Sequence, residues 1–462
     1  MRIKRIIQQI SLLLVLGGLT TDTLAQSKQG EAASVHNVPN VAVTATIKPA
    51  AAYLNPVDGL SVEDAVRYAL EHQKGLLADR KLIEEAQGRL KQAALRANPM
   101  LDVSHTSDLA SIAQGEFSVG VSVPLELGGR RTRRIEVAER ELERMRFEVA
   151  ERERKLAVEV RAKYGEAVEA ARNLELNERL LELNQQSYTL IKARVEEGAS
   201  APLEQSMLRV EVGRIEAQRT TFDTRTAVLI EELKNLLGMP LEEKLQVRDE
   251  FIERPVKLTR EQMLEIAFKS RPDLQAARAA ESLAAALIAQ AKTEGKADLS
   301  VFAEFGRQAI GFDQLGISPE SGQPERIFMK SNMVKAGVTI TLPVRNRNQG
   351  NIEAAVAASE EARLRREFAE TVVRREVAAA FVRYEGAMRV LKTYDTNLLA
   401  TSQNNLRVVR ASYDLGHVRL TEVLAEQRRQ VEVQMGYIDA LKEYYAARVE
   451  LESAIGAPLE GK

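Results

Sequence analysis

The sequence predicts a mainly α-helical chain that also carries the strands of a membrane β-barrel. The first observation is the length of two proline-free stretches, between Pro124 and Pro202 and between Pro343 and Pro458. The second is a set of short segments in which apolar and polar residues alternate, as in half-buried strands. The third is that these features occur twice in the same order, which indicates an internal tandem duplication.

The composition excludes several classes of protein. The 462 residues include 65 Lys and Arg against 66 Asp and Glu, for a net charge of −1. A nucleic-acid-binding protein would show a basic excess or a basic stripe, so no nucleic-acid partner is expected. The absence of cysteine excludes disulfides and thiolate chemistry, and the four histidines are isolated from one another. We therefore expect no metal site, no cofactor and no catalytic residue.

The N-terminus predicts export. Basic residues among positions 2–5 precede the apolar residues 10–16, and small side chains at positions 23 and 25 suit signal peptidase. The apolar run is too short for a permanent transmembrane helix. We expect a signal peptide at residues 1–25, with a disordered or buried helix as the alternative. Residues 26–58, rich in Ala, Val, Pro, Asn and Thr, predict an extended tether.

The remaining chain is predicted to consist of two repeats, residues 59–256 and 257–462. The paired landmarks are Leu60–Ala65 with Leu258–Met263, Gly120–Leu125 with Gly337–Pro343, Gly198 with Gly416, and Leu237–Glu242 with Ile455–Glu460. Four landmarks in the same order are improbable by chance, so we infer a duplication whose period is far longer than that of a solenoid repeat.

Each proline-free stretch predicts a very long helix, at residues 130–197 and 350–415. A second helix is expected after each, at residues 202–237 and 420–455. Apolar residues recur every seven positions, namely Ile135, Leu142, Val149 and Leu156 in one helix and Val377, Tyr384, Leu391 and Leu398 in the other. This period predicts left-handed coiled-coil seams. At ~1.5 Å per residue each long helix spans roughly 100 Å.

Each repeat also predicts a strand hairpin, at residues 101–125 and 299–343. Strands of about nine to eleven residues can cross an outer membrane at a tilt. The connecting loops are expected at residues 108–115 and 308–332, the latter being rich in Gly, Ser, Pro and Glu. The side chains expected to face lipid are Phe117, Val119, Val121, Val123, Val334, Val338 and Ile340. A barrel lumen needs about eight strands or more, so four strands must share a barrel with other chains.

This combination resembles the outer-membrane efflux proteins, the TolC-like family, over about residues 58–460. The matching motifs are the strand exits at residues 123–130 and 342–350, the turns at Gly198 and Gly416, and the Leu-Gly-x-Pro-Leu pattern at residues 237–241 with its counterpart at residues 455–459. The resemblance implies a homotrimer with one twelve-stranded outer-membrane β-barrel, four strands from each chain. A trimeric α-helical barrel would continue it into the periplasm. The motif at residues 346–350 is similar to that of the family branch that serves heavy-metal efflux pumps.

The function that the resemblance implies is the exit duct of a tripartite efflux pump, which passively exports substrates across the periplasm and outer membrane. The implied partners are a periplasmic adaptor (a membrane fusion protein), an inner-membrane pump of the RND type and outer-membrane lipid. A periplasmic coiled-coil adaptor or scaffold is the alternative that long hairpins alone would allow. A periplasmic enzyme is disfavoured because no nucleophile–base or metal constellation is present. Whether metal ions or drugs are exported stays open.

The turns that end the two longest helices are the candidate working sites. Gly198 and Gly416 suit a left-handed helix end, and Ser200 is expected to cap the following helix. In the resembled family these turns form the periplasmic tip, which implies adaptor docking by Gly198, Ala199, Ser200, Gly416, His417 and Val418. The acids nearby are Glu196, Glu197, Asp414 and Glu422. They can ring the tunnel mouth, where they would favour cations, or form a solvated face balanced by neighbouring arginines.

Overall fold

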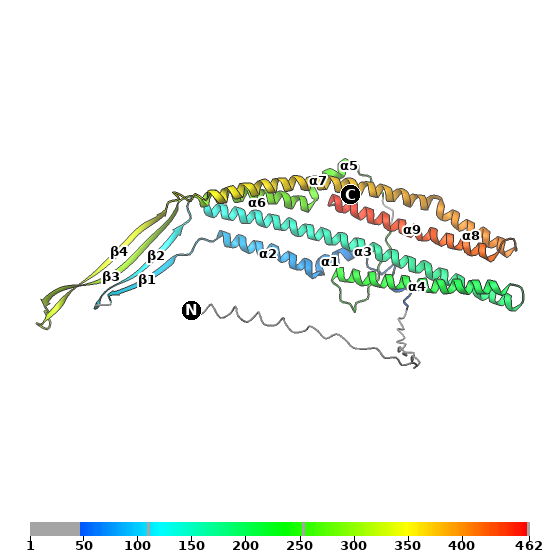
Figure 1. The fold of residues 1–462 in the computed structure, drawn as a ribbon, viewed down its shortest axis with the longest axis horizontal. Helices are drawn as coiled ribbons and strands as arrows, with labels where there is room; N and C mark the ends of the chain where they lie inside the picture. Colours follow the sequence, from blue (N-terminus) through cyan, green and yellow to red (C-terminus); the bar gives the residue numbers. More distant parts are fainter. Residues whose placement is uncertain (1–46, 109–110, 252–254, 460–462) are drawn as a thin grey trace, which may run out of the picture. The chain divides into compact units, whose positions relative to one another are not determined.

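The structure is a computed structural model that describes residues 47–108, 111–251 and 255–459. The expected signal peptide, residues 1–25, and the first part of the expected tether lie outside the described residues. The residues from Ile47 onward form one compact unit. Within it, the helices run side by side and a sheet extends from one end of them (Figure 1).

The elements of the unit follow the same order twice. In the first half they are the 3-10 turn η1 (Ala50–Ala52), α1 (Val62–His72), α2 (Lys74–Ala94), β1 (Met100–Asp108), β2 (Ser111–Leu125), α3 (Arg130–Glu196) and α4 (Pro202–Leu237). In the second half they are α5 (Arg260–Ser270), α6 (Pro272–Glu294), β3 (Asp298–Ile317), β4 (Pro324–Thr341), α7 (Gln349–Thr393), the π-helical turn η2 (Tyr394–Leu398), α8 (Leu399–Asp414) and α9 (Leu420–Ile455). Short helices, a strand hairpin, a long helix and a return helix therefore make up each repeat.

The seven-residue pattern accounts for the packing of the long helices. In α3, Leu142, Val149 and Leu156 are buried, and in α7 so are Val377 and Leu391. Two adjacent glycines, Gly128 and Gly129, precede α3, and both adopt positive φ in the turn that leads into the helix. No helix among the described residues is long and apolar enough to cross a membrane.

The second long helix departs from the expectation of one unbroken helix over residues 350–415. It passes through the π-helical turn Tyr394–Leu398, and the last heptad residue, Leu398, is exposed. At this turn the side chain of Tyr394 approaches α9 closely, and a Cβ on Gly436 would lie only 2.5 Å from the Tyr394 hydroxyl. A π-turn winds one extra residue into the helix, which changes the face that the following residues present.

The four strands form one antiparallel sheet in the order β1–β2–β3–β4. The expectation of a loop over residues 308–332 was wrong, because β3 continues to Ile317 and β4 begins at Pro324. Direct pairing overrides the loop-like composition: Gly311 lies opposite Phe328, and Gly316 opposite Glu325. The loop expected at residues 108–115 is also shorter, since Ser107 already pairs with Gly115.

Part of the expected tether is packed rather than extended. Ala50 and Tyr53 are buried, and the Tyr53 hydroxyl donates a hydrogen bond of 2.7 Å to Asp223 of α4. Leu54 forms a β-bridge with Val247 in the segment that follows the first repeat's return helix. Burial of the Tyr53 ring and pairing of its hydroxyl stabilise this segment, so residues 50–54 are not part of an extended tether.

Two duplicated tyrosines fix the inter-repeat segment to the long helices. The Tyr164 hydroxyl of α3 lies 2.6 Å from the carbonyl oxygen of Arg248, and the Tyr384 hydroxyl of α7 accepts a 2.9 Å bond from the Val256 backbone. Both tyrosines are buried at the centres of the two main hydrophobic clusters, one in each repeat. Each repeat is thus anchored by the same residue type at the corresponding place.

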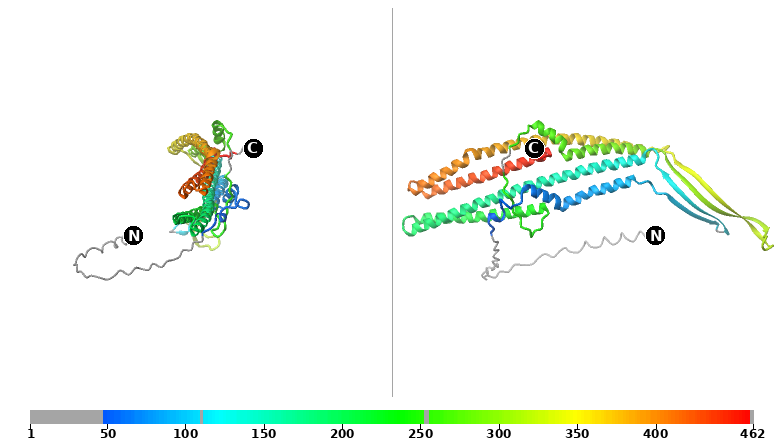
Figure 2. Two further views of the ribbon diagram at one scale, coloured as in Figure 1. Left: turned by 90° about the vertical axis from the view of Figure 1, so that its right-hand side faces the viewer. Right: turned by 180° about the vertical axis from the view of Figure 1, so that it is seen from behind.

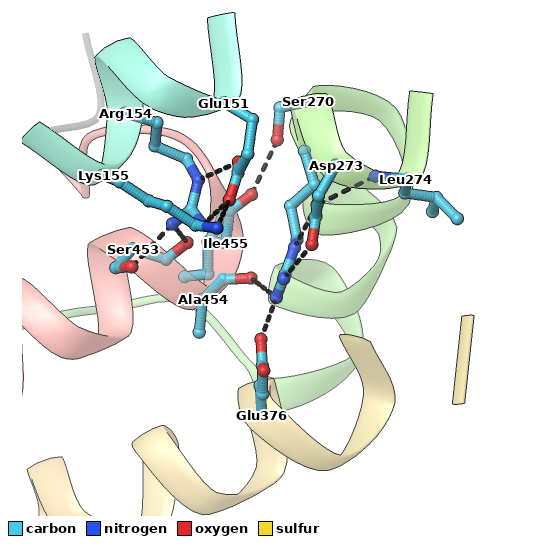
Figure 3. Close-up of polar contacts among 11 residues, drawn as sticks. Glu151, Arg154, Lys155, Ser270, Asp273, Leu274, Glu376, Ser453, Ala454 and Ile455 are labelled. Carbon is cyan, nitrogen blue, oxygen red and sulfur yellow. Dashed lines mark hydrogen bonds and ion pairs between the residues drawn. The ribbon is translucent and has the colours of Figure 1, made fainter. Parts of the chain in front are cut away.

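Two arginines, one from each repeat, contact residues at the end of α9 (Figure 3). Arg154 of α3 donates to the carbonyl and hydroxyl oxygens of Ser453 at 2.8 and 2.6 Å. Buried Arg271 contacts Asp273, Glu376 at 2.6 Å and the Ala454 carbonyl. Burial opposes the charged form of Arg271, but its two carboxylate partners raise the pKa of the guanidinium above its usual value. Removing either carboxylate would weaken the pairing of this buried charge, so the junction fixes α5, α7 and α9 together.

A glycine inside α3 permits a close approach between the repeats. A Cβ on Gly165 would lie 2.7 Å from the ring of Tyr445 in α9. We expect Gly165→Ala to destabilise the protein by about 1–3 kcal/mol, because the ring must move in a packed site. In a Tyr445→Ala background most of this cost should disappear. Denaturant unfolding of the solubilised protein measures both values.

The matched control for this substitution is Gly88→Ala in α2, where nothing lies within 4 Å of the added carbon. It should stabilise the helix by up to about 1 kcal/mol. An equal cost for Gly165→Ala with and without Tyr445 would contradict the packing described.

Candidate functional site

The two helix-ending turns have the same backbone geometry. Gly198 and Gly416 each adopt φ of 74°. After α3 the amide of Ala199 donates to the Arg194 carbonyl at 2.7 Å, and after α8 the amide of His417 donates to the Ser412 carbonyl at 2.9 Å. Each six-to-one bond encloses a second bond, in which the glycine amide donates to the carbonyl three residues earlier. This pair of bonds defines the Schellman helix end, which a glycine at positive φ permits. Duplication has therefore preserved both turns.

The helices that follow the turns begin differently. Ala201, and not Ser200 as expected, is the N-cap of α4, and no side chain caps this helix. Pro202 at the first helical position makes a cap less necessary there, because proline lacks one of the amides that need a partner. At α9 the N-cap is Arg419, whose backbone amide donates to the carboxylate of Glu422 at 3.4 Å. Glu422 thus has a local role in starting its own helix.

The two helical hairpins, α3–α4 in the first repeat and α8–α9 in the second, contact each other close to the turns. A small hydrophobic cluster joins Ile191 and Leu208 of the first hairpin to Leu420, Val423 and Leu424 of the second. A polar contact lies beside it, in which the Tyr413 hydroxyl donates to Glu204 at 3.3 Å. Burial, followed by the nearby Glu204 carboxylate, raises the pKa of the Tyr413 hydroxyl. Sequence patterns do not predict this contact, because only the fold brings Tyr413 and Glu204 together.

The acids of the turns are exposed and sparsely paired. Glu196 lies 4.0 Å from Lys192 on its own helix. Among the described residues, Glu197, Asp414 and Glu422 form no ion pair within 4 Å. Asp414 borders a groove between α3 and the second hairpin, whose wall includes Arg179 and Arg410. The structure therefore places both charge signs near Asp414, and the two interpretations of these acids stay open.

At the far end of α3 and α7, strand register sorts the sheet residues onto two faces. Residues directly opposite each other share a face. One face carries apolar rows, given by the partners Val103, Val119, Phe305 and Val334, by Leu101, Val121, Ala303 and Ala336, by Val123, Val301 and Val338, and by Leu125, Leu299 and Ile340. Phe117 continues this face and, like Val121, Val334, Val338 and Ile340, is exposed in the single chain. Val119 and Val123 are half-buried.

The opposite face of the sheet carries most of its polar side chains, although Phe302 and Met333 also lie on it. Lys335 lies 3.4 Å from Glu304 and 3.6 Å from Glu116, and the hydroxyls of Ser104 and Ser118 are 2.8 Å apart. Sequence patterns did not identify Glu304 and Glu116 as members of this face. The signal was present, because each alternates with the apolar residues of its own strand. One face suited to hydrocarbon and one suited to water are what a transmembrane barrel wall requires.

No group of three or more potential metal ligands occurs within the part of the chain that the structure describes. His417 lies exposed in its turn. The paired turns and the two-faced sheet are the candidate functional features of the described residues.

Comparison with known proteins identifies the family. The profile of the family described as "Outer membrane efflux protein" matches residues 65–239 and 263–457, which correspond to the two repeats. The chain belongs to the outer membrane efflux protein family. It is therefore an outer-membrane efflux channel, and membership favours this function over a periplasmic adaptor or scaffold.

Individual members of the family are distant in sequence. The "Cobalt-zinc-cadmium resistance protein CzcC" of Cupriavidus metallidurans is 21% identical over 401 residues, which cover 86% of this chain and 90% of CzcC. Crystal structures of CusC superpose with a TM-score of 0.69 at 21% identity, covering 86% of this chain and 92% of that one. The open-state MtrE outer membrane channel of Neisseria gonorrhoeae gives 0.68 at 18% identity, covering 95% and 98%.

The left-handed turns lead to a direct stability test. Gly416→Ala places a Cβ in a conformation that costs about 1–2 kcal/mol, whereas asparagine tolerates it better. Hydrogen exchange of the His417 amide should therefore accelerate in Gly416→Ala by roughly tenfold, and less in Gly416→Asn. Gly213→Ala in α4, where the added carbon meets nothing within 4 Å, serves as the control and should not accelerate exchange. Unchanged exchange in Gly416→Ala would contradict the described turn.

Proposed function

We propose that three copies of this chain form one channel, the exit duct of a tripartite efflux pump. The observation that supports this assembly most strongly is the sheet order β1–β2–β3–β4, which leaves β1 and β4 each with one unpaired edge. Unpaired backbone groups cannot face hydrocarbon, and four strands cannot close on themselves. Pairing of β1 with β4 of the next copy closes a barrel of twelve strands, three times four.

Exposed apolar residues on the long helix support the same assembly. In α7, Val356, Leu364, Phe368, Val382 and Val390 are each at least half exposed. Scattered apolar residues are ordinary on a protein surface, but these five lie along one helix over about fifty ångströms, given ~1.5 Å per residue. We propose that neighbouring copies cover them, so that the helices form a tube below the strands.

The tip turns are proposed to dock a periplasmic adaptor, which connects the duct to an inner-membrane pump of the RND type. Two turns of identical geometry at the end of helices of ~100 Å support this assignment, because they are the parts farthest from the sheet. Transport through the duct is proposed to be passive, with no catalytic group from this chain. Its cargo is proposed to be heavy-metal cations, and the name of the relative CzcC supports that choice.

A bulky residue at either turn should separate docking from folding. Gly198→Trp and Gly416→Trp should distort the helix end and obstruct the adaptor, while the distant sheet keeps its structure. We expect the variants to reach the outer membrane as trimers but to lose resistance to zinc and cadmium salts. Cysteines placed at Ala199 and His417 should crosslink to the adaptor in cells expressing the functional protein.

The matched control is Gly88→Trp on α2, an exposed glycine with nothing within 4 Å of an added carbon, which should keep export. Normal export by both turn variants would refute adaptor docking at the tip. Crosslinking of the turn cysteines to membrane-impermeant reagents outside intact cells would show that the proposed topology is inverted.

A further inference from the structure

We propose that Arg307 and Lys330 form a binding patch for the phosphate groups of an anionic glycolipid in the outer leaflet of the membrane. The proposal rests on the proposed function, since it uses the assignment of the apolar sheet face to lipid. It concerns a surface at the loop end of the sheet, away from the channel lumen and from the tip turns.

Strand register places the two cations next to each other. Arg307 of β3 pairs with Asn332 of β4, and Ala309 pairs with Lys330. Arg307 and Lys330 are therefore diagonal neighbours on one face, at a spacing of about 7–8 Å. Both side chains are exposed, and among the described residues neither forms an ion pair. Two free cations at this spacing are suited to a phosphorylated headgroup.

The depth of the pair matches the boundary of a bilayer. The rows from Leu299 to Phe305 on this face contain only apolar residues, and Arg307 belongs to the next row, with His105 and Phe117. Ala309, the partner of Lys330, lies ten positions after Leu299 along β3. At ~3.3 Å per residue and a tilt of about 40°, this distance is about 25 Å along the membrane normal, the height of the apolar band in such barrels.

The position identifies the leaflet and hence the lipid. The long helices leave the sheet at its Leu125 and Thr341 end, which faces the periplasm, so Arg307 and Lys330 lie at the outer surface. The outer leaflet of bacterial outer membranes holds glycolipids that carry phosphates on their sugars. Cations that flank an apolar band attract such anionic headgroups, while the acyl chains cover the apolar rows.

The opposite face provides an internal contrast. Lys335 is also a β4 cation, but it faces Glu304 and Glu116 on the polar side of the sheet. Its charge is locally balanced and directed away from lipid. Lys335→Gln therefore removes one positive charge from the same strand without touching the proposed patch.

The test uses the full-length trimer in detergent and bisphosphorylated lipid A as the probe, with affinity measured by native mass spectrometry. Arg307→Gln combined with Lys330→Gln should weaken binding about 30-fold, and Lys330→Gln alone about fivefold. Lys335→Gln should change it less than twofold. The charge-preserving pair Arg307→Lys with Lys330→Arg should retain binding. If the double variant does not form trimers, Lys330→Gln decides.

Unchanged affinity in Lys330→Gln and in the double Gln variant, or an equal loss in Lys335→Gln, would overturn the proposal. So would displacement of lipid A by millimolar inorganic phosphate, or equal binding of phosphatidylglycerol and of dephosphorylated lipid A. Zinc and cadmium resistance of the same strains separates the two hypotheses. Loss of lipid binding with export intact supports the patch, whereas a wild-type chain that binds lipid but supports no export would refute the proposed function alone.

Discussion

Open sheet edges are the constraint on which the rest of this molecule depends. A four-stranded antiparallel sheet with one apolar face must place that face in hydrocarbon, yet β1 and β4 each expose a row of backbone groups. Hydrocarbon offers those groups no hydrogen-bond partner. Pairing with further copies of the chain satisfies both requirements at once, and the proposed trimeric duct follows from this need.

The helical part transmits that geometry over a long distance. Only four residues separate β2 from α3, and seven separate β4 from α7, so the strands set the directions in which both long helices start. Tyr164 and Tyr384 then anchor the inter-repeat segment at equivalent places. The Arg154 and Arg271 contacts join the end of α9 to both repeats. Because Tyr164, Tyr384 and Arg271 are buried, these contacts fix the packing of the helices around the inter-repeat segment and the end of α9.

The duplication allows a comparison of two solutions to one design. The Schellman ends at Gly198 and Gly416 are the same, because only a residue tolerating positive φ can occupy that position. The helices before them differ: α3 is continuous, while its counterpart contains the π-helical turn at Tyr394–Leu398. The two repeats therefore share the geometry of the turn but differ in the helix that leads to it.

Local patterns predicted most of the elements, and long-range contacts explain the misses. Seven-residue spacing identified the buried side chains of Leu142 and Val377, because a helix face is a local property. Alternation likewise sorted Val121 and Ser122 onto different faces. The extension of β3 to Ile317 depends on pairing with β4, and the burial of Tyr53 depends on Asp223, 170 residues away. The approach of Tyr394 to Gly436 and the Tyr413–Glu204 contact likewise depend on how helices far apart in the sequence pack together.

The mass of the detergent-solubilised, membrane-inserted protein tests the central claim most directly. Light scattering corrected for bound detergent, or native mass spectrometry, gives the number of chains in each particle. We predict three copies of the mature chain, resistant to dissociation because β1 and β4 pair between copies. A stable monomer with a protected, closed barrel would contradict the account, because the four strands of one chain leave two edges unpaired.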